Sequence, residues 1–142
     1  MSVDRVREWL GLEGSGDTLA IPYRGTAVFI RESEWGGRRV LEILAPLSMG
    51  CRKSPGLLEL INSVNERVVI GKLVLLEGEP PAVTYSYAVP VEALSKSLVE
   101  LAVAVALAVV DTYTDDVLEV GGGAAPSLYG ASGEKGSSNK NV

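Results

Sequence analysis

Four acidic side chains lie close together near the end of the long apolar segment in the second half of the chain: Asp111, Asp115, Asp116 and Glu119. Residues four apart share one face of a helix, so Asp111 would lie beside Asp115, and Asp115 beside Glu119. Such a face could gather carboxylates around a hard cation, but Ca²⁺ and Mg²⁺ take about six or more oxygen ligands, which one helix rarely supplies. We therefore expect a solvated acidic helix end with no metal and no cofactor, and keep a metal-dependent enzyme as an alternative.

The other groups that could do chemistry lack their usual partners. Ser48, Cys51 and Ser54 are close in sequence, but the chain contains no histidine, so only a lysine such as Lys53 could act as a general base. The absence of histidine also removes the usual catalytic triads and most zinc sites. The glycine-rich stretches do not match a phosphate-binding loop, since no strand precedes the first and the run 121–123 ends a predicted helix. We predict no catalytic residue and no enzymatic activity.

Length, charge and composition favour one intracellular domain. The 142 residues, 46% of them hydrophobic, are enough to fill a single core. The single cysteine, Cys51, cannot form a disulfide within the chain, and the charged amino terminus does not match a signal peptide, so we predict a cytoplasmic location. A net charge of −5 with scattered basic residues argues against nucleic acid as a partner. The lack of glutamine is compatible with a protein that works at high temperature.

The elements that would position any site begin with a short helix capped by Ser2 and ending near Leu10. Three strands of an antiparallel meander are predicted next, at 18–23, 26–33 and 38–47, with Gly25 between the first two and the loop 34–37 between the last two. Trp35 would lie at the tip of that loop. Its indole could contact a partner or fold back over the hairpin.

A second helix is predicted after Ser54, which would cap it, with Pro55 in its first turn. Near its end, Asn65 fits a capping or turn-forming role, whereas Asn62 could instead recognise a backbone. A hairpin with its loop at 77–81 follows. The alternation of its second strand puts the large side chains on one buried face: Val83, Tyr85, Tyr87 and Val89.

The last predicted element is a long helix at 91–120. Its uncharged middle is too short to cross a bilayer, so we predict no membrane span. Its apolar residues project onto two faces. One face comprises Leu94, Leu98, Leu101, Val105, Ala108 and Val109; the other comprises Val99, Val103, Ala106, Leu107 and Val110. A sheet can cover only one of them, so we predict that the second face, Val99 to Val110, mediates self-association as a homodimer.

These elements predict a single α+β domain over residues 1–120. An antiparallel sheet of about five strands would be packed by an N-terminal, a middle and a long C-terminal helix. The glycine- and serine-rich segment 121–142 lacks periodicity and is predicted to be a disordered tail.

The segment LLELINSVNERVVIGKLVL carries a resemblance, through Leu57, Leu60, Asn62, Asn65 and Gly71. Paired asparagines on a helix that runs into a strand through a glycine resemble YbjN-like proteins, which have a type III secretion chaperone-like fold. The order of elements over 3–120 also resembles that fold. The resemblance implies an α+β domain that binds protein rather than performs chemistry, as the dimeric secretion chaperones hold extended client segments.

We therefore predict a non-enzymatic, chaperone- or adaptor-like homodimer that binds a client or regulatory protein. A small-ligand sensor is the principal alternative. It would need a closed apolar pocket between the sheet and the long helix.

Overall fold

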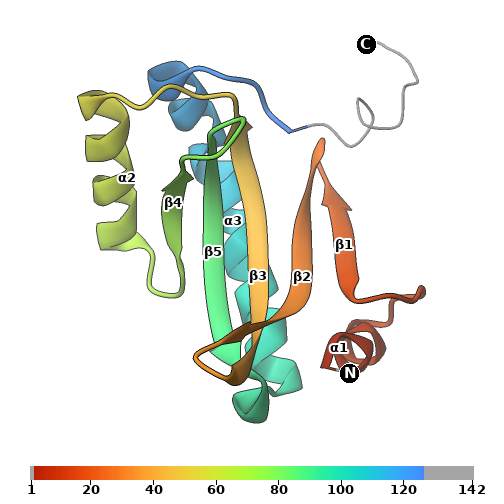
Figure 1. Ribbon diagram of the computed structural model, residues 1–142. Helices are drawn as coiled ribbons and strands as arrows, with labels where there is room; N and C mark the ends of the chain where they lie inside the picture. Colours follow the sequence, from red (N-terminus) through yellow and green to blue (C-terminus); the bar gives the residue numbers. More distant parts are fainter. Residues whose placement is uncertain (1, 127–142) are drawn as a thin grey trace.

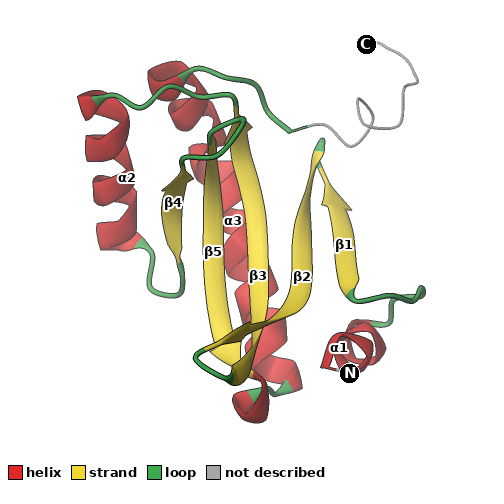
Figure 2. Ribbon diagram, viewed as in Figure 1, coloured by secondary structure: helices red, strands yellow, loops and turns green. Residues whose placement is uncertain are grey.

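The computed structural model describes residues 2–126. Three helices and a five-stranded sheet form two layers (Figures 1 and 2). The elements are α1 (Ser2–Leu10), β1 (Thr18–Tyr23), β2 (Thr26–Trp35), β3 (Arg38–Met49), α2 (Pro55–Arg67), β4 (Lys72–Leu76), β5 (Ala82–Pro90), the 3₁₀ turn η1 (Val91–Ala93) and α3 (Lys96–Gly121). The predicted α+β class, with an N-terminal, a middle and a long C-terminal helix, is confirmed.

The sheet is antiparallel throughout and has the order β1-β2-β3-β5-β4. The register places side chains of alternate residues on the same face, as the pairs Leu19–Ile30, Ile43–Tyr87 and Leu73–Tyr85 show. These residues point toward α3. The opposite face carries the ion pair Arg31–Glu42 between β2 and β3, with Nε 2.9 Å from the carboxylate.

The core fills the space between this sheet and α3, which lies behind it in Figure 1. It is built largely from branched aliphatic side chains, with Tyr85 the largest fully buried one. Leu41, Ile43 and Ala45 on β3 are fully buried, and so are Val99, Ala102 and Ala106 on α3. In the described part of the chain this space is thus occupied by side chains. This packing gives no support to the closed pocket that the small-ligand alternative required.

Two boundaries differ from those expected from the sequence. β2 extends to Trp35, so the turn is formed by Gly36 and Gly37, whose positive φ values of 60° and 78° suit a tight two-residue hairpin turn. The long helix starts at Lys96 rather than near residue 91, because the Ser95 hydroxyl accepts a hydrogen bond from the Leu98 amide and caps it there.

After α3 the chain crosses the top of the sheet in Figure 1. Ala124 exchanges two backbone hydrogen bonds with Met49, at 2.9 and 3.0 Å. The Ser48 hydroxyl donates to the Gly122 carbonyl at 2.9 Å. Gly122 and Ala124 of the predicted tail therefore contact the end of β3, Gly121 belongs to α3, and residues 127–142 lie outside the described residues. The predicted domain boundary at 120 stays a prediction.

Candidate functional site

The sheet order leaves two strands, β1 and β4, at its edges. An edge strand presents unpaired backbone N–H and C=O groups, which can pair with another chain. In an antiparallel strand these groups point alternately toward the neighbour and away from it, so every second residue faces the edge. The two edges are therefore the places where this fold could take an extended partner, and they differ.

The β4 edge is flanked by α2, whose Asn65 side chain bonds the backbone of β4 at Leu73. The Asn65 amide accepts from the Leu73 N–H at 2.7 Å and donates to the Leu73 carbonyl at 3.1 Å. Both backbone groups of Leu73 thus receive the partners that an added strand would supply. Asn65 can do this because α2 runs beside β4 (Figure 1). The turn-forming role expected of Asn65 is thus an edge-sealing role, and Asn62 is exposed.

The turn between α2 and β4 is fixed by Tyr85. Its buried hydroxyl donates to the Ile70 carbonyl at 2.6 Å. Burial, with a smaller contribution from the nearby Tyr87, raises the pKa of Tyr85 to about 12. Gly71 follows with a φ of +79°, and a Cβ there would overlap the Tyr85 hydroxyl and lie 2.8 Å from the Ser86 carbonyl. Only glycine therefore fits this turn.

The β1 edge carries unpaired backbone groups. Arg24 and Gly25, with φ values of 51° and 81°, form a two-residue turn that pairs Tyr23 with Thr26. Counting back from that pair, the backbone groups of residues 18, 20 and 22 face away from β2. The residue at position 22 is proline, which has no N–H to donate. Ala20, by contrast, offers both its N–H and its carbonyl.

Arg7 closes only the lower end of β1. Its guanidinium donates to the Thr18 carbonyl at 3.2 Å and to the Gly16 carbonyl at 2.9 Å, and pairs with Asp4 at 3.0 Å. The side chain is 6% exposed, so the arginine ties α1 to the start of β1. Thr18 keeps its N–H toward the edge. The free edge is thus centred on Ala20.

One flank of α3 lies beside β1. The Tyr23 hydroxyl donates to the Asp111 carboxylate at 2.6 Å, and this hydrogen bond is the main reason that the pKa of Tyr23 is raised. Val103 and Leu107 precede Asp111 by eight and four residues, hence lie on the same flank of the helix. Both are partly buried. Both pack against the core, and the shown contact between α3 and the end of β1 is made by Asp111.

The five residues predicted to mediate self-association are not all on one surface. Val99, Ala106 and Val110 are buried in the core of the single chain. Val103 and Leu107 are the two that remain partly accessible. The prediction of a homodimer is not decided by this placement and stays a prediction.

The acidic residues 111–119 are not assembled into a metal site. Asp111 is engaged by Tyr23 and, at 3.4 Å, by Arg24. Within residues 2–126 no group of three or more histidine, cysteine or acidic side chains is arranged to hold a metal ion. The candidate nucleophiles have structural places instead: Ser54 caps α2, and burial raises the pKa of the Cys51 thiol.

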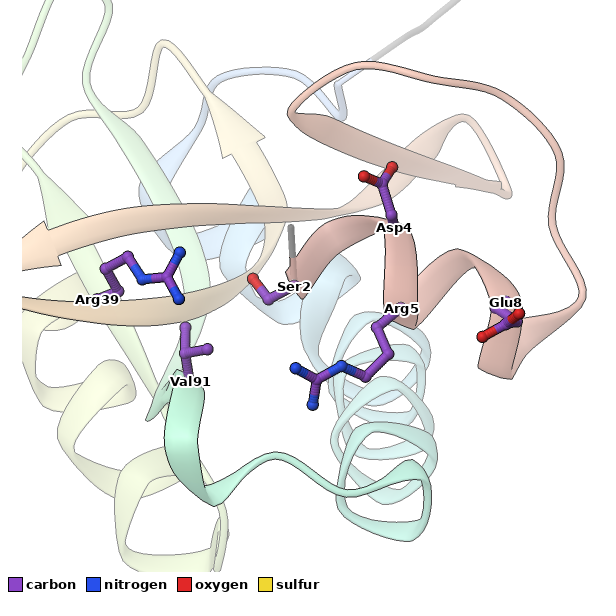
Figure 3. Close-up of a pocket in the computed structure, with 6 residues that line it drawn as sticks. All are labelled: Ser2, Asp4, Arg5, Glu8, Arg39 and Val91. Atoms are coloured by element: carbon purple, nitrogen blue, oxygen red, sulfur yellow. The ribbon is translucent and has the colours of Figure 1, made fainter.

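A hollow beside α1 carries mixed charges (Figure 3). Arg5 and Arg39 contribute guanidinium groups to it, while Asp4 and Glu8 contribute carboxylates. Arg39 pairs with Glu32 at 3.1 Å, and Arg5 stacks on Trp9. The pKa of Glu32 is lowered mainly by its hydrogen bond from Ser2. These partners give the side chains structural roles.

Among the helices of residues 2–126, α3 alone has the length and mean hydropathy, 1.6, of a membrane-spanning helix. In this fold one side of it is buried in the core against the sheet. Such a helix is also expected of a protein core.

The protein is an α+β protein whose two edge strands differ: Asn65 bonds the backbone of β4 at Leu73, whereas the outward backbone groups of Ala20 on β1 have no hydrogen-bond partner within residues 2–126. The chain belongs to the family described as T3SS (YopN, CesT) and YbjN peptide-binding chaperone 1, whose model matches residues 5–127. This confirms the resemblance inferred from the sequence. No curated protein matches the chain significantly.

The sequence placed Pro22 near a strand end or on an edge, but it did not predict β1 as a binding edge. Pro22 and the pair Arg24-Gly25 were its local signals, since proline in a strand indicates an edge. The contribution of Arg7 depends on a contact between α1 and β1 that no local pattern predicts.

Proposed function

We propose that the protein is a non-enzymatic chaperone or adaptor that binds an extended segment of a client protein by adding it as a strand to β1. The observation that supports this most directly is the unpaired backbone of Ala20 on an edge whose counterpart, β4, is sealed by Asn65. Membership of a peptide-binding chaperone family agrees with it. No catalytic step is needed, because the work is done by binding.

Backbone pairing and side-chain burial would share the affinity. An added strand can bond both groups of Ala20, the N–H of Thr18 and the carbonyl of Pro22. Each hydrogen bond contributes a net of only about 0.5–1.5 kcal/mol, so these bonds alone give weak binding. Client side chains opposite Ile21 and Tyr23 point toward the α3 flank, where burial of apolar area adds affinity and selects the sequence.

The test measures binding of a fluorescent peptide of alternating valine and threonine by anisotropy. Ala20→Pro removes the edge N–H and places a ring in the path of the added strand. We expect binding at least about tenfold weaker. Ala20→Val keeps both backbone groups and is the matched control, and circular dichroism checks the fold of both variants.

Amide hydrogen exchange provides a second measurement that does not depend on a variant. The Ala20 amide should exchange quickly in the free protein and become protected when the peptide binds. The Leu73 amide, bonded to Asn65, should be protected in both states. Unchanged exchange at Ala20 under saturating peptide would contradict addition to β1.

We further propose that the protein acts as a homodimer in the cytoplasm. The buried single thiol of Cys51 suits a reducing compartment. Support for the dimer comes from a groove between α3 and the loop after α2, lined by Leu101, Val105 and Ala108. Val69, which is 95% exposed, lies on its rim, so groove and apolar knob occur on the same surface. A two-fold interface needs such self-complementarity.

Solution mass across a dilution series tests the dimer. The wild type should be dimeric at micromolar concentrations, and Val69→Glu combined with Leu101→Glu should give a folded monomer. Leu58→Glu, another exposed leucine position on a helix, is the control and should remain dimeric. A monomeric wild type would rule the dimer out without affecting peptide binding at β1.

A further inference from the structure

The chain that follows α3 runs toward the upper end of the β1 edge (Figure 1). Ala124 and Met49 form an antiparallel bridge, and Ala82 of β5 pairs with Met49 on its other side. The chain therefore lies on the β2 side of β3 and runs opposite to it, toward the turn between β1 and β2. There the Pro126 carbonyl lies 3.8 Å from the position of a Cβ on Gly25. The last described residue is thus beside this turn.

Close packing holds this path in place. Gly123 has a φ of +81°, and a Cβ there would lie 2.6 Å from the Met49 carbonyl, so the position suits only glycine. The Ser48 hydroxyl is buried and donates to the Gly122 carbonyl at 2.9 Å. The point at which the chain reaches Gly25 is therefore fixed by contacts within the fold.

A segment that continued from Pro126 along the edge would be antiparallel to β1. The strand runs upward from Thr18 to Tyr23 in Figure 1, whereas the segment would start at the upper end and run down. Every strand pair of the sheet is antiparallel, so this direction continues the pattern of the sheet. Sixteen residues of the sequence follow Pro126, and β1 has six, so the chain is long enough to cover the edge.

The first large side chains after Pro126 suit this edge. They are Leu128 and Tyr129, which lie outside the described residues. In an added strand, one of them would face the α3 side of the sheet and the other the opposite face. On that opposite face the small side chain of Ala20 is followed by Phe29 on β2, which is half-buried. A large side chain opposite Ala20 can therefore reach over it to Phe29.

We propose that residues 127–132 add to β1 as a sixth strand when no client is bound, so that the chain carries its own competitor for the client site. This rests on the proposed function, in which β1 takes a peptide strand. Because the competitor is tethered at Pro126, its effective concentration at the edge is of roughly millimolar order. A few backbone hydrogen bonds and one or two apolar contacts, which bind weakly in a free peptide, then suffice for substantial occupancy.

The expected occupancy of the edge is partial. If residues 127–132 cover it for about three-quarters to nine-tenths of the time, a client binds about four- to tenfold more weakly than it would to an empty edge. Exchange of the Ala20 amide slows by the same factor, and it stays far faster than exchange of the Leu73 amide, which Asn65 protects. Partial occupancy shields the edge from chance pairing and still lets a client displace the segment.

The test uses the full chain and the fluorescent peptide of alternating valine and threonine. Leu128→Ser combined with Tyr129→Ser removes the apolar pair and should bind the peptide about four- to tenfold more tightly than the wild type. Leu128→Val combined with Tyr129→Phe keeps two residues that favour a strand, so this matched control should bind as the wild type does. Without peptide, the Ala20 amide should exchange faster in the serine variant by the same factor and unchanged in the control.

A combination with Ala20→Pro shows whether the effect passes through the β1 edge. Ala20→Pro disturbs the pairing of both competitors, so the serine pair should have no effect in that background. A gain that persists there would place the site of residues 127–132 elsewhere and overturn the inference. The gain should also be independent of protein concentration, because a tethered segment competes within one molecule. A gain that grows with concentration would assign the edge to a second copy and overturn the intramolecular contact.

The outcomes separate this inference from the proposed function. If the serine pair changes neither peptide binding nor Ala20 exchange, while Ala20→Pro still weakens binding, residues 127–132 do not occupy the edge and strand addition stands. If the peptide binds to neither the wild type nor the serine variant, or if Ala20→Pro has no effect on its binding, the proposed function itself fails, and the competitor role fails with it.

Discussion

The two edge strands of this sheet, β1 and β4, differ in how their outward-facing backbone groups are paired. At β4 a helix runs alongside, and Asn65 bonds both backbone groups of Leu73. At β1, within residues 2–126, Arg7 bonds the carbonyl of Thr18, and the outward N–H and carbonyl of Ala20 have no partner there. A sheet with two open edges would extend into fibres, whereas one open edge takes a single strand and stops. In the proposed function, the pairing of β4 by Asn65 leaves β1 as the edge that takes the added strand.

The largest loss of stability is expected from a substitution in the turn that leads into β4. Gly71→Ala would place a Cβ on the Tyr85 hydroxyl and close to the Ser86 carbonyl, at a φ of +79°. We expect a loss of about 3 kcal/mol or more in the free energy of unfolding, measured by urea denaturation.

Gly50→Ala is the matched control, because Gly50 has a φ of +78° and open space around its Cβ position. It should cost only the conformational penalty, about 1–2 kcal/mol. Equal losses for the two variants would show that the contact with Tyr85 does not constrain the turn.

Opening the β4 edge itself requires only Asn65→Ala. The variant leaves the Leu73 N–H and carbonyl without partners, and we expect it to lose about 1–3 kcal/mol of stability. It should also make the sheet open at both edges, hence raise the mass in concentrated solution. Asn62→Ala, three residues earlier on the exposed side of α2, should change neither stability nor mass. A stable, monodisperse Asn65→Ala protein would mean that β4 needs no seal.

The stability that Tyr85 contributes to the turn before β4 depends on pH. Its pKa in the folded chain is about 12, above the ordinary value of 10.0, so folding favours the neutral phenol. That contribution is fully present below pH 10.0 and is lost as the pH rises to about 12. Tyr85→Phe should lose about 1–2 kcal/mol at neutral pH, since the Ile70 carbonyl loses its donor. The gap to wild type should narrow as the pH rises through this range, as urea titrations would show.

Much of this architecture could be predicted from the sequence because it depends on local periodicity. The alternation predicted the buried face of β5, where Val83, Tyr85 and Val89 are buried and Tyr87 is partly buried. Ser54 and Pro55 predicted the start of α2. The boundary at Ser95 was missed because apolar spacing continues through η1, and only the capping hydrogen bond shows where the helix begins.

The candidate site was harder to predict because it depends on contacts between distant segments. Asn65 was recognised as a turn residue, but its bonds to Leu73 require α2 and β4 to lie side by side. Val103 and Leu107 could be distinguished from their core neighbours only through the hydrogen bond between Tyr23 and Asp111. Helical projection gave two apolar faces, and the sheet covers parts of both.

The smallest expected effect comes from Pro22→Ala, which tests the hydrogen-bonding capacity of the β1 edge. Proline at this position withholds one donor from the open edge, so alanine would add an N–H facing outward next to Ala20. One additional hydrogen bond contributes a net of about 0.5–1.5 kcal/mol, so the peptide should bind roughly two- to tenfold tighter. Stability should change little, because the new donor faces water in the free protein. The same peptide with its backbone N-methylated outside the paired positions serves as a control and should gain equally. Unchanged affinity would mean that the client strand does not extend past Ala20 toward the turn, and the register of the added strand would have to be shifted toward Thr18.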